Sequence, residues 1–153
     1  MGGGGRSMLG TRCLGRKGSA TVLGLLVLAW SVVCTGCYWM RYEALAETHL
    51  ELLTSYADKL LAEVEHGRGP APGDWPEFTY PGDRAADFAR IVAGRFQGRE
   101  SLRELRATIV IYQNMTRGPE AVAGRDALAR LRQERQALGR AAARTRAALA
   151  RED

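Results

Sequence analysis

The chain has 153 residues, enough for one modest domain, and carries 22 basic against 17 acidic side chains, for a net charge of +5. Arg6, Arg12, Arg16 and Lys17 account for four of these positive charges, and from Tyr38 onward basic and acidic residues nearly balance. The basic excess is therefore an orientation signal in front of an apolar segment, and it gives no ground for expecting a nucleic-acid-binding protein.

An uncharged apolar segment follows the basic N-terminus. Residues 19–40 contain no charged side chain and are rich in Leu, Val and Ala, so they could cross a hydrocarbon core that needs about 20 apolar residues. Basic residues precede the segment and only Arg41 follows it directly, a bias that keeps the N-terminus in the cytoplasm. We predict a basic region over 1–18, a hydrophobic signal or transmembrane anchor over 19–40, and an exported domain over 41–153.

The end of the apolar segment leaves two outcomes open. If the segment is retained as a signal anchor, Tyr38, Trp39 and Tyr42 would lie at the outer headgroup level, where amphipathic rings are favoured. If it is cleaved, residues 20–33 form the apolar core of an export signal, followed by small residues and a cysteine. Both outcomes place the folded part outside the cytoplasm.

The sequence that ends at Cys37 resembles the end of bacterial lipoprotein signal peptides, in which a short apolar or small tripeptide, often closing with Gly, precedes an invariant Cys. Thr35, Gly36 and Cys37 match this pattern, whereas Cys34 departs from it, because the family usually has an aliphatic residue there. The resemblance covers only the first quarter of the chain. It implies that the Cys37 thiol takes up a diacylglyceryl group before the leader is removed, and that several acyl chains then hold the protein on the membrane.

An amphipathic helix is predicted over residues 42–66. Its apolar residues recur at steps of three and four, which places them on one face. This face consists of Leu45, Leu50, Leu53, Tyr56, Ala57, Leu60, Leu61 and Val64, widened by Leu52. The helix is net acidic, and the Gly and Pro residues from Gly67 to Pro70 end it.

Residues 67–82 are expected to form a loop, because prolines and glycines recur throughout this segment. Trp75, Phe78 and Tyr80 distinguish the loop from a purely flexible connection, which has no use for large apolar rings. The rings either plug one end of a helical bundle, the interpretation we favour, or form a surface patch that docks a partner protein.

Two shorter helices are predicted next, over 83–97 and 101–117. Asp83 is the expected N-cap of the first, and Ser101 to Glu104 has the pattern of a capping box that begins the second. The expected inner faces are Ala86, Phe88, Ile91, Val92, Arg95 and Phe96 on the first helix and Leu102, Leu105, Ile109, Tyr112 and Met115 on the second. A short strand over 108–112 is the alternative, because that stretch is rich in β-branched residues.

A long basic helix is predicted over 119–151. Its inner face consists of Leu128, Leu131, Leu138, Ala142, Thr145 and Leu149, with Arg135 at one inner position. Because the first helix is acidic and the last is basic, we expect the two to pair and their charges to set the register. Anionic lipid headgroups or a wall polymer are alternative partners for the outer face of the last helix.

Catalytic and metal-binding patterns are not found in the sequence. His49 and His66 lie too far apart on one helix to share a metal, we expect both to be ordinary surface residues, and no Cys follows Cys37. No phosphate-binding glycine loop or nucleophile elbow is present. We therefore expect no enzyme activity, no cofactor and no metal.

Together these features predict an all-α protein with an N-terminal anchor helix and a small antiparallel bundle of about four helices that ends in a long helix. The expected role is interaction or scaffolding in the cell envelope, on the periplasmic side of the cell or outer membrane. Membrane lipid and another envelope protein are the expected partners, and nucleic acid is not. The alternatives are a single-pass assembly or lysis component with a coiled-coil-like periplasmic region, and an enzyme that acts on wall polymers through carboxylates such as Asp83 and Asp87.

Overall fold

The computed structural model describes residues 18–124 and 126–152, with side chains from Arg41 onward except those of Pro119 and Ala121. The described residues contain no strand, so the all-α prediction is confirmed for them. They form the α-helices α1 (Gly18–Glu65), α2 (Trp75–Phe96), α3 (Glu100–Met115) and α4 (Ala127–Glu152) and a short 3-10 helix, η1 (Pro119–Val122).

The chain divides into two compact units, Met1–Trp39 and Met40–Asp153, which we call the N-terminal unit and the helical unit. In the N-terminal unit the structure describes helical backbone from Gly18 onward. The predicted basic region and the side chains of the apolar run, including Cys37, lie outside what the structure describes. No helix among the residues searched, which exclude that run, is long and apolar enough to cross a bilayer.

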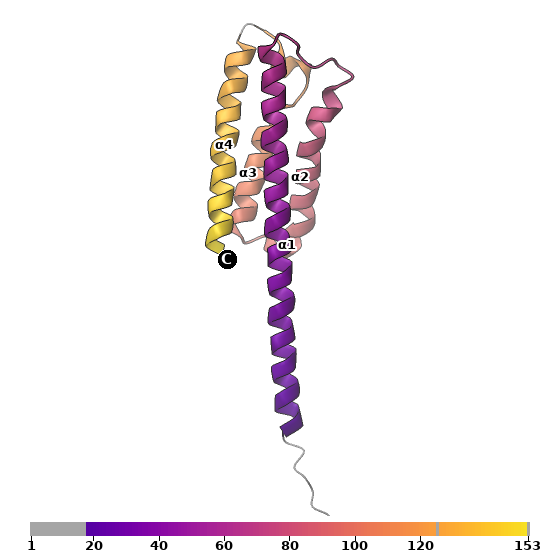
Figure 1. Cartoon of the computed structure of the whole chain (residues 1–153), viewed down its shortest axis with the longest axis vertical. Helices are drawn as coiled ribbons and strands as arrows, with labels where there is room; N and C mark the ends of the chain where they lie inside the picture. The colour runs from indigo at the N-terminus through magenta and orange to yellow at the C-terminus, as the bar shows by residue number, and fades with distance from the viewer. Residues whose placement is uncertain (1–17, 125, 153) are drawn as a thin grey trace, which may run out of the picture. The chain divides into compact units, whose positions relative to one another are not determined.

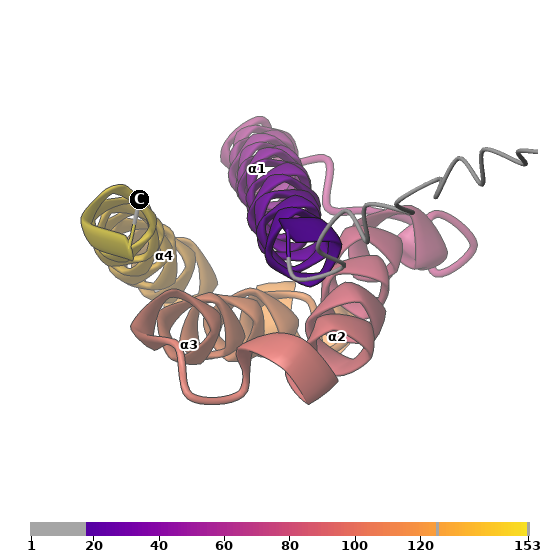
Figure 2. The same ribbon diagram turned by 90° about the horizontal axis from the view of Figure 1, so that it is seen from below.

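In the helical unit the four helices run alternately up and down, and each packs antiparallel to the next (Figure 1). Figure 2 shows them arranged as a ring in the order α1, α2, α3, α4. Tyr42 near the start of the unit meets Phe96 at the end of α2, with ring centroids 4.4 Å apart, which fixes the antiparallel direction of that pair. The predicted antiparallel four-helix bundle is thus confirmed.

The part of α1 that belongs to the helical unit buries one stripe of side chains. The buried residues are Tyr42, Ala46, Leu50, Leu53, Ala57 and Leu60, spaced three and four apart as a helix packed in a bundle requires. The prediction was wrong for Leu45 and Leu52, which are 44% and 41% exposed. The reason is rotational: at about 100° per residue these two leucines lie well outside the arc that the buried stripe occupies.

Helix α2 begins at Trp75 and not at Asp83, so much of the predicted loop is helical. Pro76 lies in the first turn, where a missing N–H costs no hydrogen bond, while Pro81 lies inside the helix. Asp83 is therefore an exposed residue within the helix and not its cap. The connection between α1 and α2 is shortened to the residues between Glu65 and Trp75.

The buried face of α2 also differs from the prediction. Phe78, Ala85, Ala89 and Phe96 are buried, whereas Ile91 is 77% exposed. Small residues on this face allow α3 to approach closely: a Cβ added at Gly82 would lie only 3.0 Å from Cδ1 of Tyr112. A search for large hydrophobic residues does not reveal such a face, because its residues are buried on account of their small size.

The predicted inner face of α3 is confirmed, since Leu102, Leu105, Ile109, Tyr112 and Met115 are all buried in a helix that includes the alternative strand region. The prediction of a single C-terminal helix over 119–151 was wrong at its start. Gly118 and Gly124 adopt positive φ angles of 149° and 96°, conformations that interrupt a helix and that glycine tolerates. The segment therefore forms η1 first, and α4 begins only at Ala127.

Candidate interaction surfaces

A hydrogen-bonded network joins three helices at the end of the bundle where Tyr42 lies. The Ser101 hydroxyl donates to Oε2 of Glu152 at 2.6 Å, and the Tyr42 hydroxyl lies 3.2 Å from Ser101 Oγ. Oε1 of Glu152 accepts from the backbone N–H groups of Glu100 and Ser101 at 2.7 and 3.3 Å. A carboxylate at the end of α4 thus caps the first turn of α3, where unpaired N–H groups and the helix dipole favour negative charge.

This network corrects the predicted capping box. Ser101 lies inside the first turn of α3 and bonds to Glu152, while Glu104 is held by Arg144 at 3.0 Å. A serine hydroxyl beside a carboxylate also resembles a nucleophile with its base, but Ser101 has no exposed surface through which a substrate could reach it. Burial raises the pKa of the Tyr42 phenol, so that group stays neutral. The arrangement therefore ties helices together.

The three rings considered as a possible docking patch, Trp75, Phe78 and Tyr80, lie in different surroundings. Trp75 and Phe78 are buried, and the Trp75 indole donates to the carbonyl of Thr116 at 3.1 Å. Tyr80 is 59% exposed, with the Arg84 guanidinium 5.7 Å from its ring centroid. Trp75 and Phe78 thus fill the end of the bundle, in agreement with the favoured interpretation. Of the three rings, Tyr80 is the one that a partner can reach.

Acidic α1 and basic α4 pair as expected. Arg132, Arg135 and Arg146 bind Glu65, Asp58 and Glu47 at 2.9, 2.5 and 2.7 Å. The hydrogen bond to Asp58 raises the pKa of Arg135, which occupies the inner position noted in the sequence. Because these guanidinium groups already hold carboxylates, the basic character of α4 is largely engaged within the bundle, which weakens the case for α4 as a surface for anionic polymers.

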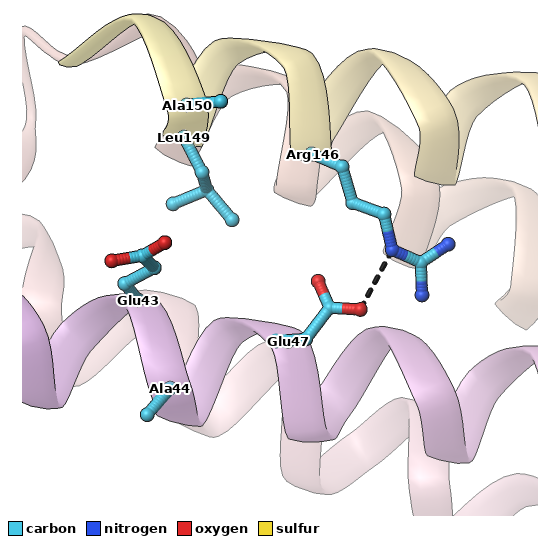
Figure 3. A pocket seen from close by; sticks show the side chains of 6 residues that line it. All are labelled: Glu43, Ala44, Glu47, Arg146, Leu149 and Ala150. Atoms are coloured by element: carbon cyan, nitrogen blue, oxygen red, sulfur yellow. Dashed lines mark hydrogen bonds and ion pairs between the residues drawn. The ribbon is translucent and has the colours of Figure 1, made fainter. Parts of the chain in front are cut away.

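A shallow groove of about 420 Å³ lies between α1 and α4 (Figure 3). Arg146 reaches across it to Glu47, and the Leu149 side chain points into it from α4. Glu43 lies one turn before Glu47 on the same wall. The groove combines one engaged ion pair with a small apolar surface, a composition suited to contact and not to holding a cofactor.

A second groove, of about 320 Å³, lies between α2 and α3. It is lined by the apolar residues Ala86, Ala89, Ile109 and Val110 and by Arg90, Arg106 and Gln113. Arg90 binds Asp87 at 2.8 Å, so one of the carboxylates considered for wall-polymer chemistry is already paired. Two of its lining residues are the small Ala86 and Ala89 of α2.

Four large apolar side chains of α1 and α2 are exposed. They are Leu45 and Leu52 on α1 and Tyr80 and Ile91 on α2, and the half-buried His49 lies between the two leucines along α1. The His49 ring meets Phe88 with centroids 4.8 Å apart, and burial lowers its pKa. His49 was expected to be an ordinary surface residue, and the leucine spacing of seven was the available signal for a second face.

No group of three or more His, Cys, Asp or Glu side chains that could hold a metal ion occurs among the described residues. Comparison of the chain with protein-family models, with curated proteins and with solved structures gives no match. The surfaces described above are therefore the basis for a functional proposal.

Proposed function

We propose that this protein is tethered to a membrane of the cell envelope by its N-terminus and presents a small helical bundle on the extracytoplasmic side, where it binds or positions another envelope component. One observation carries this proposal. The uncharged apolar run ends at Met40, and the compact helical unit begins at the same residue. A segment with the composition of an anchor is therefore followed directly by a separate folded unit.

An interaction role is supported over a catalytic one because several carboxylates are already bound to other groups of the bundle. Glu152 caps a helix, Asp58 and Glu65 pair with α4, and Glu77 pairs with Lys59 at 2.7 Å. Five large apolar side chains of the described unit are exposed, and shallow grooves lie between α1 and α4 and between α2 and α3. Such surfaces are typical of protein contacts.

Two chemistries for the tether follow from the sequence. Acylation of Cys37 fits the lipoprotein-like tripeptide before it. The alternative is a retained signal anchor of an assembly or lysis component. The expectation that Tyr42 lies at the headgroup level in that case was wrong, because Tyr42 is buried in the bundle, which leaves only Tyr38 to Arg41 as a connection after Cys37. Either tether would hold the bundle close to the bilayer.

Intact mass of the full chain extracted from membranes distinguishes the two tethers. Loss of residues 1–36 with added acyl mass is the expected result. Cys37→Ser should abolish this processing, because the thiol is the acyl acceptor, and the matched variant Cys34→Ser should leave it unchanged. An unprocessed chain in the membrane fraction would establish the retained anchor instead. Recovery of the wild-type chain in the soluble fraction, without detergent, would refute the tether itself.

A further inference from the structure

The outer face of α1 carries a second stripe at heptad spacing. Leu45, Thr48, Leu52 and Ser55 are all exposed, and they succeed one another at steps of three, four and three residues. This is the heptad repeat by which helices pack along one another in coiled coils. The buried stripe of α1 already serves the bundle, so this second stripe is left without a partner among the described residues.

Helix α2 widens the same apolar surface. Ile91 lies one turn beyond Phe88, whose ring meets Tyr42 and His49 of α1 with centroids 5.9 and 4.8 Å apart. Ile91 thus follows a residue by which α2 meets α1, and most of the Ile91 side chain is exposed. Beneath this surface Nδ1 of His49 is buried and has no hydrogen-bond partner.

The stripe is free of charge from Leu45 to Ser55, and the repeat positions on either side of it are the exposed Arg41 and Lys59. The next residue in the repeat, Lys59, is drawn toward α2, where its ammonium lies 2.7 Å from Glu77 and 5.4 Å from the centroid of the Phe78 ring. The positive charge of Lys59 is thus balanced by Glu77, to the side of the stripe. A partner that met this stripe would encounter leucine, threonine and serine.

We propose that the partner on this stripe is a second copy of the same chain, packed in a parallel two-fold contact. The inference rests on the proposed tether, which gives all copies the same orientation and brings their stripes to the same height above the bilayer. In a parallel two-fold contact each residue near the axis meets its own counterpart. Like charges would then oppose each other, and an uncharged stripe with leucines seven residues apart satisfies this condition.

The tether also supplies the concentration that this contact needs. Two partly exposed leucines, Ile91 and the small residues between them offer much less surface than the roughly 1,600 Å² that a stable complex in solution usually buries. Confinement of two copies to one membrane raises their effective concentration without new contacts. The dimer is therefore a property of the tethered chain.

Photo-crosslinking in intact membranes tests this inference. Two differently tagged full-length chains are coexpressed, each with p-benzoylphenylalanine in place of Thr48, and capture of one tag after irradiation should recover the other in a covalent species of twice the chain mass. The same substitution at Arg140, an exposed residue of α4, serves as the positional control and should give no such species.

A charge placed on the axis should remove the contact. Leu52→Glu is expected to lower the crosslinked fraction roughly tenfold, because two carboxylates would oppose each other at the same level. Val110→Glu, at another exposed apolar residue, should leave it unchanged. Circular dichroism of both detergent-purified variants checks that the helices are intact.

The outcomes separate the dimer from the tether. A chain in the membrane fraction that shows no crosslink from Thr48, or a crosslink only to a protein of different mass, overturns the dimer and leaves the tether standing. A crosslinked fraction equal in Leu52→Glu and wild type also overturns it. A chain recovered in the soluble fraction refutes the tether and with it the parallel register.

Discussion

Buried polar groups at single residues determine how the ends of the bundle are held. Tyr112 has no exposed surface, and its hydroxyl donates to the carbonyl oxygen of Phe78 at 2.6 Å. Phe78 lies one turn after the start of α2, and in the helical pattern its carbonyl also faces the backbone N–H of Gly82, four residues later. Tyr112 thus adds a second donor to this carbonyl and joins α3 to α2. Burial raises the pKa of this phenol, so it remains a donor throughout the physiological range.

Tyr112→Phe should therefore destabilise the folded chain. It removes the hydroxyl but keeps the ring, so the Phe78 carbonyl loses its bond from α3, a net loss of about 0.5 to 1.5 kcal/mol for one hydrogen bond. The free energy of unfolding from urea titration measures the effect. Tyr80→Phe is the matched control, because the Tyr80 ring is exposed. Equal stability of the two variants would show that the Phe78 carbonyl does not depend on Tyr112.

At the scale of the helix, α2 shows what can and cannot be predicted from the sequence. The three-four spacing of large apolar residues located the buried face of α3 and, apart from Leu45 and Leu52, that of α1, because each has a leucine or aromatic residue on most turns. The face of α2 is built from Ala85, Ala89 and Gly82, which pack by being small against Tyr112. Hydrophobicity instead pointed to Ile91, which is exposed. A rule that equates large apolar residues with burial fails wherever close helix approach selects small ones.

The interaction surface was missed for the same reason. Leu45 and Leu52 were assigned to the core because they are leucines, although their spacing of seven residues places them together on a different side of α1 from Leu50 and Leu53. The apolar character of Trp75 and Phe78 was recognised, but the prolines beside them were taken to exclude a helix. Pro76 lies in the first turn, which accepts proline. The opposite net charges of the first and last helices, by contrast, predicted their pairing directly.

The register of α4 against α1 should depend on the pair between Arg135 and Asp58. Both nitrogens of the guanidinium fork, Nε and Nη2, bind the two carboxylate oxygens at 2.5 and 2.8 Å. Arg135 is also the more sheltered partner, with a quarter of its side chain exposed. A two-point contact of this kind is more specific in direction than a single ion pair.

A double-mutant cycle with Asp58→Ala and Arg135→Ala measures this contribution. We expect a coupling energy of about 0.5 to 1 kcal/mol, at the upper end for surface pairs because the contact is bidentate and partly sheltered. The coupling should shrink in high salt, which screens exposed charges. The cycle of Asp58→Ala with Arg140→Ala is the control, since Arg140 has no ion pair with Asp58. Additive effects in the first cycle would contradict a role for this pair in setting the register.

At the scale of the whole molecule, one face of α1 contributes to folding and another face is available for association. Leu50, Leu53, Ala57 and Leu60 bury their side chains inside the unit. Thr48, Leu52 and Ser55 remain outside, on a surface too small to hold two free copies together. The stability of the unit should therefore be independent of concentration, while its self-association should depend on the tether.

Residues 41–153 produced without the N-terminal segment should form a cooperative helical monomer, because the core lies within the helical unit. Thermal unfolding followed by circular dichroism should give one transition with the same midpoint at micromolar and at tenfold higher concentration, and sedimentation should give the monomer mass. The neighbours Leu52 and Leu53 provide a matched pair: Leu52→Glu should leave the midpoint nearly unchanged, whereas Leu53→Glu should abolish the transition, because it places a carboxylate at a position with no exposed surface. Helix content that rises with protein concentration would show instead that the bundle is completed only by a partner, in which case the outer stripe of α1 contributes to folding as well as to association.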